Sequence, residues 1–322
     1  MINAAGVIAL TAGSAAFAGA AYSAASYTIT KTLMDIALDH EPPKILTALK
    51  SRISRSRKAS DFTIARSRAE EEINRRAHQL IKITAADGTE LSGHFFPVSE
   101  PKRIIVAFHG WRARWGRDFG MISHFWESEG SSMLLVEQRG QNGSLCRHMG
   151  FGLTERFDCV DWTKWAAENY PGIPVYLAGI SMGGTTVLMA ADLDLPEQVH
   201  GIMADCAFTS PDGIWRHVVH DNLHLPYNLR SKVADLICRS KIGYSSKQFS
   251  TQSSLAHAKV PVLLIHGEND NFVPVSMCYE NYKACATPVK LLTVSDADHG
   301  MSYFVNRADY EKMMREFWAD YD

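Results

Sequence analysis

From about His78 onward, short apolar segments alternate with amphipathic ones, and this rhythm restricts the fold more than any other feature of the chain. Short apolar runs are typical of buried strands, and the segments between them have the period of helices. A strand–helix–strand repeat predicts crossover connections on a mostly parallel sheet. The first two predicted strands alternate in period two around Asp87-Gly88, which indicates an antiparallel hairpin. We expect eight strands at 79–84, 91–96, 104–108, 133–136, 175–178, 201–204, 262–265 and 289–294, and helices at 119–129, 155–169, 184–193, 275–286 and 308–319.

One insertion interrupts this alternation. About fifty residues between Phe208 and Lys259 lack a clear buried strand and are rich in aromatic, His and Leu side chains. In an open α/β sheet, a helical insert that leaves the carboxyl end of a strand lies over the ligand crevice. We therefore interpret residues 209–257 as a helical cap inserted after the sixth strand.

The motif Gly179-Ile180-Ser181-Met182-Gly183 lies between a predicted strand and a predicted helix. This strand–turn–helix context is the one that a nucleophile elbow requires. The turn is so tight that glycines are needed on both sides of the serine, whose strained backbone exposes its hydroxyl. Ser181 is therefore the predicted nucleophile.

A serine nucleophile needs a base, and the base needs an acid that orients it. Asp270 follows the predicted strand at 262–265, and His299 follows the last strand, so both come after Ser181 in the expected order. Glu268 is the fallback acid, and an ordinary helix cap ahead of Pro274 is the alternative role for Asp270.

The oxyanion hole should use two backbone N–H groups. One belongs to Met182, directly after the nucleophile. The other belongs to Trp111, in the loop that follows the strand at 104–108. Alternatively, the Trp111 side chain forms a wall of the pocket.

Together these motifs resemble the α/β-hydrolase superfamily, and in particular a bacterial serine-peptidase-like and esterase-like branch with a helical cap. The resemblance covers residues 79–321 and includes the acid loop at 266–274 and the Asp298-His299-Gly300 segment. An Asp is more usual where Gln138 stands, so the loop at 138–144 departs from the family pattern. The resemblance implies acyl transfer to water with Ser181, His299 and Asp270 as the triad, without a cofactor.

The N-terminal segment differs from the rest of the chain. Residues 1–30 carry no charged side chain and are rich in Ala, Gly and Ser. Residues 4–26 are long enough to cross a bilayer but only marginally hydrophobic. We expect three parts: an apolar segment at 1–30, a basic helical linker at 31–77 and a catalytic domain at 78–322. Two interpretations stay open for residues 1–58: membrane association that tethers a cytoplasmic catalytic domain, or a helix packed on the body or a mobile tail.

Composition excludes several other classes of protein. The net charge of −2 gives no reason to expect nucleic acid as a partner. None of the six cysteines forms a C-x-x-C pair. His217, His220 and His224 have helical spacing, but no carboxylate support is evident in the sequence, and we expect no metal.

The sequence thus predicts a serine hydrolase that cleaves carboxylic esters of small-molecule acyl substrates. A serine peptidase or amidase is the alternative within the same fold, because its substrates react through the same chemistry. A thioesterase, a membrane-anchored lipase and a non-catalytic ligand-binding protein are further alternatives.

Overall fold

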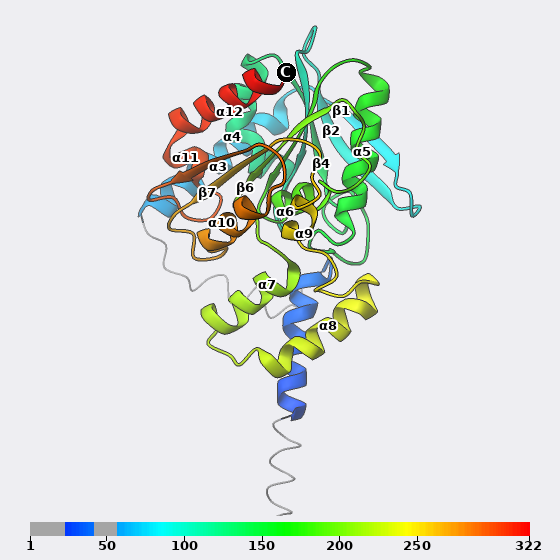
Figure 1. The fold of residues 1–322 in the computed structure, drawn as a ribbon, viewed down its shortest axis with the longest axis vertical. Coiled ribbons are helices and arrows are strands. Elements are labelled where there is room, and N and C mark those ends of the chain that lie inside the picture. Colours follow the sequence, from blue (N-terminus) through cyan, green and yellow to red (C-terminus); the bar gives the residue numbers. More distant parts are fainter. Residues whose placement is uncertain (1–22, 42–56) are drawn as a thin grey trace, which may run out of the picture.

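An eight-stranded mixed sheet forms the centre of the computed structural model, which describes residues 23–41 and 57–322 (Figure 1). The strand order is β1-β2-β4-β3-β5-β6-β7-β8. β1 and β4 both pair antiparallel with β2, and all other pairs are parallel. This arrangement confirms the predicted fold class. The strands are β1 (Gln79–Thr84), β2 (Glu90–Phe96), β3 (Arg103–Phe108), β4 (Ser131–Glu137), β5 (Val175–Ile180), β6 (Val199–Asp205), β7 (Val262–Gly267) and β8 (Val289–Val294).

Two layers of helices cover the faces of the sheet (Figure 1). Each layer buries its apolar side chains against one face of the sheet and so forms a separate core. Burial of this apolar surface is the dominant favourable contribution to folding. One face carries α5 (Glu155–Asn169), α6 (Met182–Met189), α9 (Thr251–Leu255) and α10 (Val275–Ala284). The other carries α3 (Arg57–Arg75), α4 (Trp115–Ser128), α11 (Ser302–Val305) and α12 (Arg307–Tyr321).

Helix α3 belongs to the segment predicted as a linker, and it packs closely against α4. A side chain at Gly120 would place its Cβ 2.7 Å from the backbone oxygen of Ala69, so the two helices touch at a position that only glycine allows. Phe62 and Ile73 of α3 are buried. This half of the segment is therefore part of the packed body.

The predicted helical insertion after β6 is present as α7 (Pro211–Arg216), the π-helix η2 (His217–Asn222) and α8 (Asn228–Ile242). A helix at residues 23–38 lies beside α7 and α8, so that three helices form a lobe apart from the sheet (Figure 1). Met34 and Leu38 of this N-terminal helix share an apolar core with the cap. We refer to residues 23–38 as the N-terminal helix.

Most of the segment predicted as a membrane anchor, and residues 42–56 of the basic segment, fall outside the described residues. Within the part of the chain that the structure describes, no helix has both the length and the hydropathy to cross a bilayer.

Candidate active site

Ser181 stands in a sharp turn between β5 and α6. Its φ of 57° and ψ of −118° are unfavourable for a residue with a side chain. The turn is tight on both sides: a Cβ at Gly179 would lie 2.3 Å from the carbonyl group of Gly183, and a Cβ at Gly183 would lie 1.8 Å from the backbone oxygen of Phe108. The backbone N–H of Ser181 donates to the oxygen of Asp205 at 2.8 Å, which ties the turn to β6. The amino end of α6 points at the same place and favours negative charge there.

A chain of hydrogen bonds links Ser181, His299 and Asp270. Nε2 of His299 lies 2.9 Å from Oγ of Ser181, and Nδ1 lies 2.7 Å from Oδ2 of Asp270. A carboxylate can only accept, so Nδ1 carries the proton and Nε2 offers its lone pair to the serine hydroxyl. The three residues come from the ends of β5, β7 and β8, which lie together because the carboxyl ends of parallel strands meet at one edge.

Asp270 is buried and held by several donors. Its Oδ1 accepts the backbone N–H groups of Phe272 at 2.9 Å and Val273 at 2.8 Å, and Nε2 of His266 lies 3.3 Å from Oδ2. Burial by itself raises the pKa of Asp270, but hydrogen bonds from His266 and His299 outweigh it and hold that pKa well below its usual range. The carboxyl is therefore ionised at neutral pH.

The two other carboxylates near the histidine make different contacts. Glu268 accepts hydrogen bonds from Thr293 and Ser295 at 2.9 and 2.7 Å. Asp298 accepts the backbone N–H of His299 at 2.7 Å and does not face its ring nitrogen. Geometry thus favours Asp270 as the acid.

The backbone N–H groups of Met182 and Trp111 were the predicted oxyanion donors. Ser181 Cβ is 3.3 Å from the position that a Cβ on Gly110 would take, so the loop of Trp111 lies against the elbow. In the described part of the chain, neither amide donates a hydrogen bond to another protein group. Both amides are thus left for a ligand, as an oxyanion hole requires.

Two side chains that the sequence analysis missed support this loop. Asp118 of α4 accepts the backbone N–H of Gly110 at 2.8 Å, and Gln141 accepts that of Arg112 at 2.6 Å. Gln141 belongs to the segment that departs from the family pattern. No local motif marks such contacts, because the partners are 8 and 29 residues apart in the chain.

An apolar cavity of about 130 Å³ opens beside Ser181. Its walls come from the cap, the loops of the sheet edge and the N-terminal helix. Trp111 and Phe272 stand between this cavity and a second one of about 290 Å³, which also reaches Ser181 and His299. The Trp111 side chain therefore does form a pocket wall, as one of the two interpretations of this residue expected.

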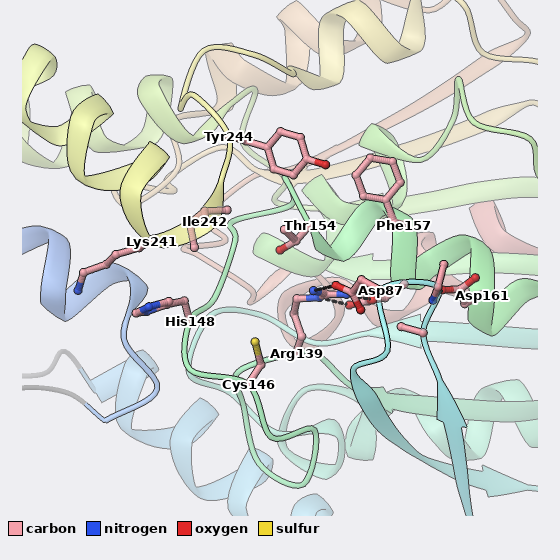
Figure 2. A pocket seen from close by; sticks show the side chains of 13 residues that line it. Asp87, Arg139, Cys146, His148, Thr154, Phe157, Asp161, Lys241, Ile242 and Tyr244 are labelled. Atoms are coloured by element: carbon pink, nitrogen blue, oxygen red, sulfur yellow. Dashed lines mark hydrogen bonds and ion pairs between the residues drawn. The ribbon is translucent and has the colours of Figure 1, made fainter.

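A further cavity of about 480 Å³ lies away from Ser181, between the β1–β2 turn, α5 and the end of α8 (Figure 2). Several of its charged side chains are paired: Arg139 with Asp87 and Asp158, and Lys241 with Asp35 of the N-terminal helix. This cavity contains none of the three linked residues, and we do not assign it to the candidate active site.

The histidines of the cap are paired with one carboxylate. Nδ1 of His217 and Nδ1 of His220 lie 2.8 and 2.6 Å from the oxygens of Asp221. Asp221 thus supplies the carboxylate that was not evident from the sequence, and both histidines use it on the exposed surface of the cap.

The sheet order, the helices on both faces and the elbow after β5 define an α/β-hydrolase. Solved structures agree: an esterase of Pyrococcus furiosus superposes with a TM-score of 0.62 at 20% identity, covering 76% of this chain and 91% of the other. An acylaminoacyl peptidase of Pyrococcus horikoshii has a TM-score of 0.56 at 17% identity, covering 76% and 41%.

The chain belongs to the prolyl oligopeptidase family, whose sequence profile matches residues 148–321, more than half of its length. The uncharacterized protein YqkD of Bacillus subtilis is 27% identical over 238 residues, which cover 73% of this chain and 77% of YqkD. The uncharacterized protein YfhR of Escherichia coli is 22% identical over 246 residues, covering 74% and 79%. The fold and the family support a hydrolase.

Proposed function

We propose that this chain is a serine hydrolase that cleaves carboxylic esters through an acyl-enzyme. The observation that carries the proposal is the hydrogen-bonded chain from Ser181 through His299 to Asp270, placed at the mouth of an apolar cavity. The strained elbow and the two free amides beside it support the same assignment.

In the proposed reaction, Oγ of Ser181 attacks the ester carbonyl while Nε2 of His299 takes its proton. The amides of Met182 and Trp111 bind the oxyanion of the tetrahedral intermediate. The bond from carbon to the alkoxy oxygen then breaks, and the leaving alcohol receives the proton from His299. Water repeats these steps on the acyl-enzyme, releases the acid and restores Ser181. Asp270 stays ionised and holds the imidazole in the tautomer that can accept the proton.

The apolar cavity favours an ester over a peptide. Among the described residues that line it, Arg230 carries the only formal charge, so no carboxylate faces the cavity to hold a substrate amine. An acyl chain needs apolar contacts, and those are what the cavity offers. A serine peptidase or amidase with the same residues is the second candidate, and a ligand-binding protein without catalysis is the third.

Hydrolysis of a p-nitrophenyl ester series, from acetate to palmitate, tests this proposal together with fluorophosphonate labelling. We expect turnover and labelling in the wild type, and loss of both in Ser181→Ala. Ser295→Ala removes an exposed hydroxyl and serves as the matched control, with both signals retained. Labelling of Ser181 with turnover of amides alone would favour the peptidase candidate. An unlabelled wild type would contradict the catalytic assignment.

A further inference from the structure

The N-terminal helix forms one wall of the cavity beside Ser181. Thr30, Leu33, Met34, Ile36 and Ala37 line it, opposite side chains of the cap and of the sheet edge. These positions recur at helical spacing, so a single face of the helix points into the cavity. Figure 1 shows this helix running beside α7 and α8, although it precedes both by more than 150 residues of sequence.

The opposite side of the same helix is fixed by charge. Asp35 of the helix and Asp39, directly after its last residue, both bind Nζ of Lys241 in α8, and the distance from Nζ to Oδ1 of Asp35 is 2.7 Å. Asp39 also lies 3.0 Å from Nδ1 of His148. These contacts are partly buried, so solvent and salt screen them less than fully exposed pairs. The helix therefore has a defined orientation toward the cap.

Two consecutive residues of the oxyanion loop hold the carboxyl end of this helix. The guanidinium of Arg112 donates to the backbone oxygens of Ile36 at 2.8 Å and Asp39 at 2.6 Å. The indole N–H of Trp111 donates to the oxygen of Ala37 at 2.9 Å. Helix carbonyls at this end lack partners within the helix, and a cation there also interacts favourably with the helix dipole.

The same contacts constrain the loop. Trp111 carries one of the two proposed oxyanion amides, and its side chain and that of Arg112 are both bonded to the N-terminal helix. Arg112 has a φ of 51°, a backbone conformation that a residue with a side chain adopts only when its surroundings hold it. Removing the helix would release both side chains and the loop backbone that carries the N–H of Trp111.

We propose that the N-terminal helix is a working part of the active site. With the cap it encloses an acyl-binding cavity for an apolar acyl group of about six carbons, since an apolar cavity of ~150 Å³ in another protein holds benzene. Through Trp111 and Arg112 it also fixes the loop that bears one oxyanion amide. This inference rests on the proposed function, because it names the acyl class and a positioning element for that same site.

The acyl part of the inference is tested in the full chain by the ratio of kcat/KM for p-nitrophenyl hexanoate to that for acetate. Leu33→Trp places a larger side chain in the cavity, and the ratio should fall about a hundredfold, because roughly four additional methylene groups lose their apolar contacts. Ile29→Trp changes an exposed position of the same helix, 41% exposed and outside the cavity, and should leave the ratio unchanged.

Met34→Ala provides the opposite change. It enlarges the cavity, and the preferred acyl chain should become longer by one or more carbons. Thermal unfolding of each variant shows whether it folds, and if Leu33→Trp does not, the Met34→Ala result decides. An unchanged chain-length profile in a folded variant would overturn the inference. An unlabelled Ser181 in the wild type would instead overturn the proposed function.

The positioning part is tested with Arg112→Met. Loss of its hydrogen bonds to the helix should lower kcat for acetate about tenfold with little change in KM, because the acyl group of acetate makes few contacts with the cavity and the oxyanion amide is displaced. Arg114→Met, at an exposed arginine of the same loop, is the matched control and should retain kcat. Equal kcat values in the two variants would refute the positioning role.

Discussion

Replacement of Asp270 by Asn is the sharpest test of the hydrogen-bonded chain, because the local backbone dictates how the amide must orient. The N–H groups of Phe272 and Val273 both point at Oδ1, at 2.9 and 2.8 Å. In Asp270→Asn the amide oxygen must therefore occupy this position, and the NH₂ group must face His299. An NH₂ group donates, so Nδ1 of His299 has to accept, and the ring proton moves to Nε2.

The new tautomer blocks the reaction at its first step. Nε2–H then faces Oγ of Ser181 and has no lone pair with which to take the hydroxyl proton. The corresponding Asp-to-Asn substitution in the triad of trypsin-like proteases lowers kcat about 10⁴-fold, equivalent to ~5.5 kcal/mol of transition-state stabilisation. The same tautomer argument applies here, so we expect kcat/KM to fall by about this factor.

The assay is hydrolysis of the best p-nitrophenyl ester, with fluorophosphonate labelling as a second readout. Asp298→Asn is the matched control. The side chain of Asp298 accepts the backbone N–H of His299, which an amide oxygen can also accept, and activity should stay within about twofold of the wild type. Asp270→Asn with more than a tenth of wild-type activity would refute the reasoning. So would an equal loss in Asp298→Asn.

Three further predictions concern the site and its surroundings. Burial raises the pKa of Asp205 to about 6, so the folded state holds its proton more tightly than the unfolded chain and loses stability as pH rises from about 4 to 6. Urea unfolding should show the advantage of Asp205→Asn over wild type growing by ~2.5 kcal/mol from pH 4 to pH 7, and a constant difference would contradict the raised pKa. Gly183→Ala should abolish fluorophosphonate labelling, since its Cβ would lie 1.8 Å from the backbone oxygen of Phe108. Gly172→Ala is the control, because a Cβ there meets nothing within 4 Å. This control should retain labelling and lower the free energy of unfolding by only about 1 kcal/mol, because φ at Gly172 is positive. Asp118→Ala should lower kcat about tenfold, because it releases the backbone N–H of Gly110. Asp118→Asn keeps an oxygen that can accept this N–H and should retain the wild-type kcat. Equal kcat in the wild type and both variants would exclude a positioning role for Asp118.

The sequence predicted the sheet well, for a physical reason. Buried strands need continuous apolar runs, and both β1 and β8 were predicted with the bounds that the structure gives them. The elbow has its own signature because its glycines are sterically required. Once strands were assigned, the loops after β7 and β8 had to meet the elbow at one edge, which brought Asp270 and His299 to Ser181.

Contacts that depend on backbone groups could not be predicted in this way. Asp118 and Gln141 hold the backbone N–H groups of Gly110 and Arg112, and the side chain of Arg112 holds carbonyls of the N-terminal segment. Every residue has backbone groups of this kind, so no residue pattern marks which of them will be used. His266 is similar: its contact with Asp270 depends on how the acid loop folds back after β7.

The sequence of the N-terminal helix did indicate that this helix packs against the body, but the absence of charged residues up to residue 30 obscured that pattern. Lys31, Asp35 and Asp39 recur at intervals of four and form a polar stripe, with Nζ of Lys31 2.6 Å from Asp35. Leu33 and Ala37, also four apart, lie on the face toward the cavity. A helix with a charged stripe and an apolar face is typical of packing against a folded body.

The contacts of this helix determine which truncations can test membrane association. A chain shortened to begin at residue 78 would lose the predicted anchor, but it would also lose a wall of the cavity beside Ser181 and the partners of Trp111 and Arg112. Reduced hydrolysis in such a chain would follow from either loss. A chain that begins at residue 23 keeps every contact of the N-terminal helix described above. If the chain that begins at residue 23 partitions differently into detergent while its kcat/KM for soluble esters stays at the full-length value, the segment before residue 23 acts on location and not on catalysis.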